Sequence, residues 1–120
     1  MNESKFQSNL IKDLNNYGWF YNTNDRFRAG IPDVLGCYRG IHIAIEVKVD
    51  SNTVTPLQKF ELRRISESGG VACVARYRNT TKIYSVTHNT QTFETANMKE
   101  ITTWILELSL SNIKKNVMTA

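Results

Sequence analysis

Hydrophobic and polar residues alternate most strictly in the middle of the chain, over residues 41–49. Isoleucine or valine occupies every second position, and the positions between them hold His42, Ala44, Glu46 and Lys48. Alternation of this kind, with β-branched residues on one side, predicts a strand whose apolar face packs against a core. Residues 31–35 read as a second short strand, and residues 38–40 read as a turn. The pattern therefore predicts a β-hairpin at the centre of the chain.

Apolar residues at helical spacing predict three helices. The first covers residues 3–16, and the last begins after Asn97 with Glu100 as its capping partner. The middle helix follows Thr55, which is a favoured N-cap, with Pro56 at the first helical position and Gln58 three residues after the cap. Gly69 and Gly70 end this helix.

The remaining apolar segments read as strands or loops. Residues 19–21 form an aromatic strand start, and residues 82–86 form a strand. Residues 71–75 are continuously apolar, as in a strand buried on both faces, and one helix joins them to residues 41–49, so these two strands should be parallel. Residues 87–96 read as a loop rich in Thr and Asn. We expect a single domain over residues 1–111 and a flexible tail over residues 112–120.

Composition restricts the class of protein. The 120 residues are 41% hydrophobic and 22% charged, which is typical of a single globular domain. No apolar run is long enough to cross a bilayer, and residues 1–5 lack the apolar core of a signal peptide, so we expect a cytoplasmic protein without a membrane partner. The net charge of +4 fits a polyanionic partner, although many proteins with this charge bind none.

Cysteines and histidines give no metal-site pattern. Cys37 and Cys73 stand apart, each in an expected strand, and we interpret them as reduced core thiols rather than a disulfide. His42 shares a strand face with Glu46 but lies about 13 Å from it along an extended strand, too far to bind the same metal. His88 is expected in a loop, and the roles of both histidines stay open.

The central hairpin brings three chemically useful residues together. If its strands pair, Asp33 comes close to Glu46 and Lys48. Magnesium prefers oxygen ligands, usually one or two carboxylates completed by water and substrate phosphate. A lysine beside such a metal can orient or help deprotonate an attacking water. The alternative is a surface ion pair between neighbouring strands, which is common and nearly neutral in energy. Spacing alone does not choose between them.

The same residues carry a family resemblance. Pro32-Asp33 followed by Glu46-Val47-Lys48 resembles the signature of the PD-(D/E)XK nucleases. With the surrounding Gly30-Ile31, Thr55-Pro56-Leu57-Gln58 and Gly69-Gly70-Val71, the chain resembles the minimal VRR-NUC branch of that superfamily, which is similar to Holliday-junction resolvases. The resemblance covers residues 3–74. It implies a restriction-endonuclease-like α/β fold, in which a central mixed β-sheet is flanked by helices on both faces.

The resemblance also implies roles for individual residues. Asp33, Glu46 and the backbone carbonyl of Val47 would bind Mg²⁺ or Mn²⁺, and Lys48 would be the catalytic lysine. Glu3 matches an acid that completes the metal site in such families; its alternative is a carboxylate favoured at a helix start. Gln58 matches a catalytic-site glutamine; its alternative is the capping partner of Thr55.

Basic residues surround this group in the sequence. Phosphate contacts by such residues position DNA without reading its sequence and make binding salt-dependent. For any single residue a solvated surface position is the alternative, and Arg28 ranks first because it precedes Asp33 by five residues. The candidates for DNA binding are Arg26, Arg28, Lys59, Arg63 and Arg64.

The expected function is that of a metal-dependent DNA endonuclease without an organic cofactor, most of all a Holliday-junction resolvase. The alternatives are a nuclease acting on flaps, single strands or duplex, and a non-catalytic DNA-binding or assembly module. Symmetrical cutting of a four-way junction needs two active sites related by a two-fold axis, so we expect a homodimer. Its interface would be the last helix or residues 19–21. The small size resembles that of phage or mobile-element members.

Overall fold

The computed structural model describes residues 1–24 and 28–119, with side chains described through residue 111. Its helices and strands, in chain order, are α1 (Glu3–Leu14), β1 (Trp19–Asn22), β2 (Val34–Tyr38), β3 (Ile41–Val49), α2 (Pro56–Glu67), β4 (Val71–Arg78), β5 (Ile83–His88), β6 (Gln91–Thr95) and α3 (Met98–Thr119). The strands form one sheet in the order β1-β2-β3-β4-β5-β6.

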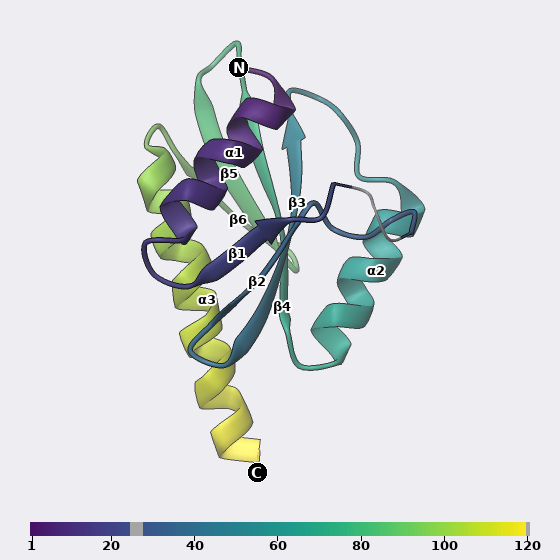
Figure 1. Cartoon of the computed structure of the whole chain (residues 1–120), viewed down its shortest axis with the longest axis vertical. Helices are drawn as coiled ribbons and strands as arrows, with labels where there is room; N and C mark the ends of the chain where they lie inside the picture. The colour runs from purple at the N-terminus through teal and green to yellow at the C-terminus, as the bar shows by residue number, and fades with distance from the viewer. Residues whose placement is uncertain (25–27, 120) are drawn as a thin grey trace.

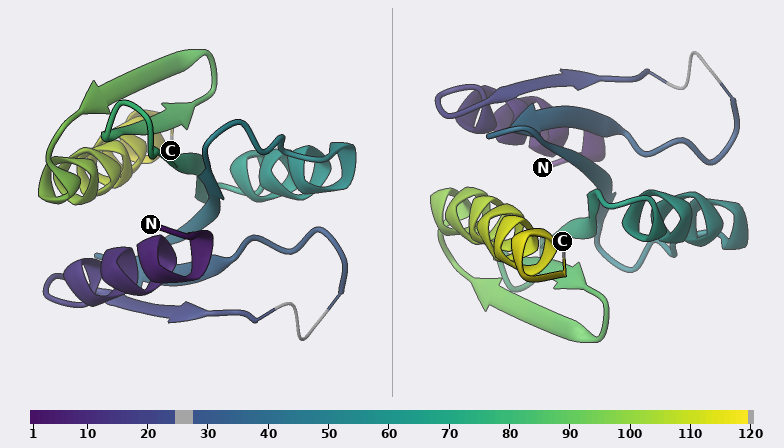
Figure 2. Two further views of the ribbon diagram at one scale, coloured as in Figure 1. Left: turned by 90° about the horizontal axis from the view of Figure 1, so that it is seen from above. Right: turned by 90° about the horizontal axis from the view of Figure 1, so that it is seen from below.

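The sheet is mixed, and helices cover both of its faces. β3 and β4 pair in parallel, whereas every other neighbouring pair is antiparallel. The two ribbons β1–β2 and β5–β6 therefore flank a parallel centre (Figure 1). α1 and α3 lie on one side of the central strands, and α2 lies on the other (Figure 2). The expected α/β architecture, including the parallel pairing across α2, is confirmed.

The main core lies between the sheet and the pair α1–α3. Ile43, Ile45 and Val47 of β3 are fully buried there, because their alternation puts them all on one face. They pack in one cluster with apolar residues of both helices, among them Phe6, Leu10, Leu14, Ile101 and Ile105. The opposite face of β3, which carries Glu46 and Lys48, is therefore the face that α2 covers.

The strand before β3 begins later than expected. β2 starts at Val34, so Ile31 and Pro32 precede the ladder, and the strand continues through Gly36 to Tyr38. A side chain at Gly36 would collide with the Phe20 ring and the Trp19 carbonyl. The glycine thus lets β1 and β2 approach closely, although glycine is disfavoured inside strands.

Three further expectations need correction. Residues 91–95 form β6 within the segment read as a loop, because Thr and Gln on an exposed edge strand give no apolar alternation. Cys37 is exposed, while Cys73 is buried as expected, and both thiols are free. α3 runs from Met98 to Thr119; the domain end at residue 111 and the flexibility of the tail stay predictions. His88 ends β5, and its Nδ1 lies 3.1 Å from the Ala72 carbonyl oxygen.

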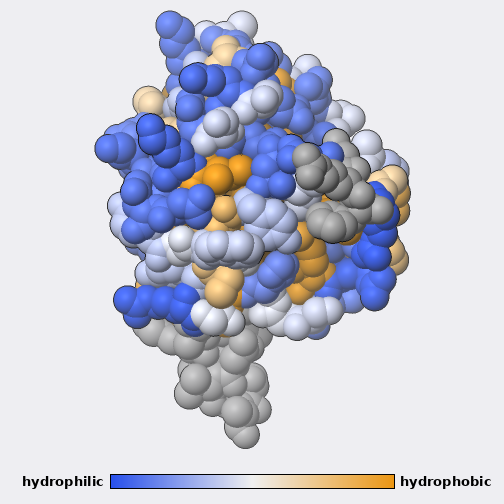
Figure 3. Space-filling model, viewed as in Figure 1, coloured by the Kyte–Doolittle hydropathy of each residue, from blue (hydrophilic) through white to orange (hydrophobic). Residues whose placement is uncertain are grey.

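No helix among the described residues combines the length and the apolar character needed to cross a bilayer. The face seen in Figure 3 is largely polar, and its apolar areas are small and separate.

The start of α2 is confirmed in detail. The Gln58 amide N–H donates to the Thr55 hydroxyl oxygen at 3.2 Å, and the Gln58 side-chain oxygen accepts from the Thr55 amide at 2.9 Å. These two bonds form a complete capping box, with Pro56 at the first helical position. The cap fixes where α2 leaves the loop that follows β3.

We predict that Thr55→Ala lowers the free energy of unfolding by about 1 kcal/mol, because the first turn of α2 loses its side-chain acceptor. Chemical denaturation monitored by circular dichroism measures this loss. Thr53→Ala is the matched control, since Thr53 is exposed in the same loop and makes no hydrogen bond in the described part of the chain. Equal effects of the two substitutions would contradict the prediction.

Candidate active site

The ladder between β2 and β3 places Asp33 beside Glu46. Val34 pairs with Ile45 in the antiparallel register, so the preceding residue, Asp33, lies opposite Glu46. The Val47 amide donates to Asp33 Oδ2 at 2.9 Å, which holds the carboxylate against β3. On the other side, the Thr23 hydroxyl donates to the Pro32 carbonyl at 2.9 Å and the Thr23 amide donates to the Asp33 carbonyl at 3.0 Å. Asp33 is thus fixed from two strands.

The Val47 carbonyl receives no backbone hydrogen bond from the strand segment that contains Pro32. Extending the register places Pro32 opposite Val47, and proline has no backbone N–H to donate. In a hydrogen-bonded antiparallel pair the two residues exchange both bonds, so the carbonyl of Val47 points to the same side as its amide, toward Asp33. An oxygen atom is therefore available next to the two carboxylates.

Glu46 is the most unusual group of the site. Only 1% of the residue is exposed, and its Oε2 has no hydrogen-bond partner among the described residues. Lys48 Nζ lies 3.9 Å from the other oxygen, Oε1, which is an ion-pair distance but too long for a hydrogen bond. Burial first, and then the neighbouring Asp33 carboxyl, raise the pKa of Glu46 to about 9, against a smaller opposing effect of Lys48.

The donor set fits a hard divalent cation. Two carboxylates and a carbonyl oxygen are the ligand types that Mg²⁺ takes, and it usually keeps several waters. A cation would also give the unpartnered Oε2 of Glu46 a favourable neighbour. The described residues contain no cluster of three or more His, Cys, Asp or Glu side chains with metal-binding geometry, so no third such side chain joins Asp33 and Glu46 there.

Lys48 lies on the same sheet face as Glu46 and is only 8% exposed. Its partner in the β4 register is Arg76, whose guanidinium donates to the Asp50 and Asn52 carbonyls at 2.7 Å each. These two hydrogen bonds from Arg76 stabilise the turn after β3, next to Lys48. Sequence reasoning missed this arginine because the register between β3 and β4 brings it there.

The structure separates Glu3 from Gln58. Glu3 lies on the first turn of α1 and lines a cleft of about 380 Å³ together with Asp33, and its charge adds to the causes that raise the pKa of Glu46. Gln58 uses its side-chain oxygen in the capping box, as in the structural alternative. The metal role of Glu3 and the catalytic role of Gln58 stay predictions.

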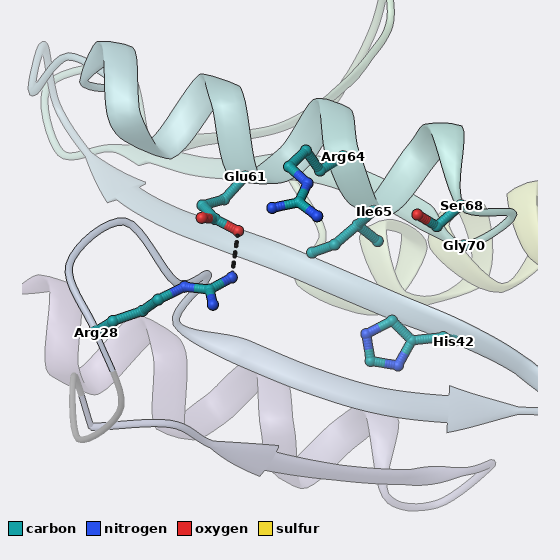
Figure 4. Close-up of a pocket in the computed structure, with 7 residues that line it drawn as sticks. All are labelled: Arg28, His42, Glu61, Arg64, Ile65, Ser68 and Gly70. Atoms are coloured by element: carbon teal, nitrogen blue, oxygen red, sulfur yellow. Dashed lines mark hydrogen bonds and ion pairs between the residues drawn. The ribbon is translucent and has the colours of Figure 1, made fainter.

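Two of the expected DNA-binding residues converge on one cleft. Arg28 and Arg64 line a cavity of about 340 Å³ between the loop before β2, β3 and α2, together with His42 (Figure 4). The Arg28 guanidinium pairs with Glu61 at 3.0 Å, and the Glu61 side chain is only 9% exposed. We refer to this cavity, lined by Arg28, His42, Glu61, Arg64, Ile65, Ser68 and Gly70, as the basic cleft.

The other expected DNA-binding residues lie elsewhere. Lys59 and Arg63 line a separate cavity of about 280 Å³. Arg63 also lies 3.9 Å from Glu67, and both Arg63 and Arg64 lie over the ring of Phe60 at 5.8 and 5.9 Å from its centre. Arg26 lies outside the described residues.

Sequence reasoning also missed Glu61 and the place of His42. Glu61 lies four residues before Ile65, so helical spacing puts both on the sheet-facing side of α2. An acid on that side indicates a buried ion pair, and this signal was present in the sequence. The convergence of His42 with α2 depends on the tertiary structure, because 22 positions separate His42 from Arg64 in the numbering.

No protein-family model and no curated protein sequence matches this chain. Among solved structures, it is similar to Hjc of Archaeoglobus fulgidus, a Holliday junction resolvase from an archaeal hyperthermophile. The TM-score is 0.55 at 16% identity, and the match covers 76% of this chain and 84% of that one. This likeness shows the fold alone: the chain has a mixed α/β fold similar to that of Hjc.

We predict that Glu46→Gln stabilises the metal-free protein increasingly as the pH rises from about 4.5 to about 9. In the folded wild type the carboxyl keeps its proton up to a pKa of about 9, whereas the ordinary value is 4.5. Stability of the wild type therefore falls across this interval, by at most about 1.4 kcal/mol per pH unit. Glutamine carries no titrating proton, so the variant lacks this loss.

Thermal unfolding in EDTA at a series of pH values measures the effect. Glu107→Gln, on the exposed side of α3, is the control and should follow the wild type. Parallel profiles for the wild type and Glu46→Gln would contradict the prediction.

Proposed function

We propose that this chain is a metal-dependent, structure-selective DNA endonuclease of the VRR-NUC type, with a four-way junction as its first substrate. One observation carries the proposal: Asp33 lies opposite a buried Glu46 that has an unpartnered oxygen, with Lys48 3.9 Å away. The resolvase-like fold supports it. A purely structural ion pair of Glu46 with Lys48 does not account for the second acid, Asp33, beside it, because like charges raise the energy of both.

The residues of the site divide the chemistry among them. Asp33, Glu46 and the Val47 carbonyl would hold Mg²⁺ or Mn²⁺, with Glu3 as a further candidate ligand. The cation supplies positive charge that polarises the phosphodiester and stabilises the charge that develops in hydrolysis. Lys48, held near Glu46 on the same strand, orients the attacking water and offsets negative charge on the phosphate.

The basic cleft extends the site along β3. His42 precedes Glu46 by four residues on the same face, about 13 Å away along the strand. Arg28 and Arg64 add positive charge to this end. Phosphates of DNA next to the cut would bind there, which orients the strand along β3 with its scissile phosphate at Asp33 and Glu46.

A branched substrate and a homodimer belong to the same proposal. Two equal cuts across a junction require two copies related by a two-fold axis. Trp19 and Tyr21 on the edge strand β1 are exposed, with their rings 5.1 Å apart, and α3 is the second candidate interface. The proposed compartment is the cytoplasm, of the host cell if the chain is of phage origin.

We predict that Asp33→Asn abolishes cleavage of a labelled four-way junction while junction binding persists, because the metal loses a charged ligand. Lys48→Ala should lower turnover by about 10²–10⁴-fold. Incubation with Mg²⁺, Mn²⁺ or EDTA, of the junction, a flap and the matching duplex, measures both effects. Asp13→Asn and Lys12→Ala, on the last turns of α1, are the matched controls and should cut normally.

Each pattern of products has a defined meaning. Paired symmetrical nicks that need both metal and Asp33 support the resolvase. Cleavage of the flap or duplex alone keeps the nuclease and removes the junction from the proposal. Binding without any cutting indicates a non-catalytic module, and undiminished cleavage by Asp33→Asn would overturn the site.

We predict that Arg64→Ala weakens junction binding and reduces the slope of log affinity against log salt by about 0.9, as expected for one lost phosphate contact. Arg28→Ala should do the same in a Glu61→Gln background, which avoids leaving a buried charge without its partner. Arg39→Ala, in the exposed turn between β2 and β3, is the control. Fluorescence anisotropy across a salt series measures the slopes, and an unchanged slope would place Arg64 outside the DNA path.

A further inference from the structure

A second cleft lies on the α1 side of the site, and its chemistry differs from that of the basic cleft. Its volume is about 380 Å³, which is within the range of clefts that hold small organic ligands. One wall is formed by the first two turns of α1. The other is formed by the end of β1, by Asn24 two residues later, and by Asp33. The lining residues are Glu3, Ser4, Gln7, Asn22, Asn24 and Asp33. We refer to this cavity as the amide cleft.

Gln7 is the residue that marks the amide cleft as a binding site. It is only 8% exposed, and its side-chain amide makes no hydrogen bond to any described residue. The amide atoms are not among the fully buried unpartnered ones, so they reach the cleft, where a ligand can supply the partners that the protein does not. Gln7 lies one helical turn after Glu3, so both side chains project from the same face of α1 toward Asp33.

The charges of the amide cleft exclude a bare phosphate as its ligand. Glu3 and Asp33 line it, Glu46 lies beside Asp33, and no Lys or Arg is among its lining residues. A divalent cation held by Asp33 and Glu46 would balance the charge of two of these three carboxylates and leave the charge of the third, Glu3, unbalanced. A neutral ligand with both donors and acceptors is therefore favoured, and a primary amide offers both.

We propose that the amide cleft binds one nucleoside of the cleaved strand, next to the scissile phosphate, and that the Gln7 amide hydrogen-bonds the edge of its base. The inference rests on the proposed nuclease function, and it assigns a substrate-binding role to a residue outside the nuclease signature. Glutamine amides pair well with base edges, which present a donor beside an acceptor.

The proposal has a consequence for the choice of substrate. A base that enters a cleft between α1 and β1 must leave its stack and its pairing partner, and this costs least where the base is already unpaired. Nucleotides at a branch point meet that condition. The amide cleft would then favour branched DNA over intact duplex, while the basic cleft binds phosphates irrespective of branching.

The test combines a protein substitution with a substrate lesion. Gln7→Leu is compared with the wild type on the DNA that the wild type cuts best, and on the same DNA with an abasic residue placed on either side of the cut. We expect Gln7→Leu to lose about tenfold in kcat/KM on intact DNA, as for one hydrogen bond. One abasic position should cost the wild type a similar factor, and the same lesion should cost Gln7→Leu nothing further.

Controls separate folding from binding. Ser8→Ala, on the exposed side of the same turn, should respond to the lesion as the wild type does. Thermal unfolding should show Gln7→Leu to be at least as stable as the wild type, and Gln7→Met serves as a second variant if the leucine variant does not fold.

The outcomes distinguish the two proposals. The nucleoside site is overturned if the losses in kcat/KM from the substitution and from the lesion multiply, or if Gln7→Leu cuts intact DNA as well as the wild type. Either result leaves the proposed nuclease function intact. If the wild type binds DNA without cutting it, we compare the affinities of the wild type and Gln7→Leu for intact and for abasic DNA. Separate losses of affinity that multiply would again overturn the nucleoside site. A chain that neither cuts nor binds DNA overturns both proposals.

Discussion

The burial of Glu46 is the constraint on which the rest of the site depends. A carboxylate in the centre of a sheet is costly to ionise, and here it has one unpartnered oxygen, a second acid next to it and a lysine at 3.9 Å. The flanking residues Ile45 and Val47 hold it in place, because their burial on the opposite face of β3 fixes the direction in which Glu46 must point. The stability of the core thus keeps an acid in a position where its ionisation is unfavourable.

Backbone chemistry prepares the same place from the other strand. Pro32 ends the ladder without donating to Val47, and Asp33 takes the Val47 amide with its side chain. The hairpin therefore opens at the residue pair where the acids meet. This opening gives two carboxylates and a carbonyl oxygen at one point, and it explains why a proline is suited to the position before the aspartate.

The surroundings of the acids are divided by charge. The basic cleft, with Arg28 and Arg64, suits phosphates, whereas the amide cleft carries acids and amides and suits a neutral group. A nucleic-acid strand offers both kinds of group in alternation. The sheet that carries both clefts has a fold similar to that of Hjc, but folds of this kind host many functions, so function has to be inferred from the residues of the site.

The sequence by itself determined the elements that depend on local pattern. The alternation of residues 41–49 defined β3 and its two faces, and Thr55, Pro56 and Gln58 defined the start of α2. The pairing of Asp33 with Glu46 followed from these, because a hairpin with a short turn has few possible registers. Gln7 and Glu61 were also visible in principle, as polar residues at the spacing of the buried helix faces.

Tertiary structure decided what depends on long-range packing. β6 forms because β5 offers a free strand edge to a polar segment. Cys37 is exposed because it lies between Trp19 and His42 on a part of the sheet face where both of these residues are exposed too. The ion pair of Arg28 with Glu61, the hydrogen bonds of Arg76 beside Lys48 and the two clefts all join segments far apart in the chain. Periodicity reports which face of an element is buried, whereas the partner on that face is chosen only when the elements pack together.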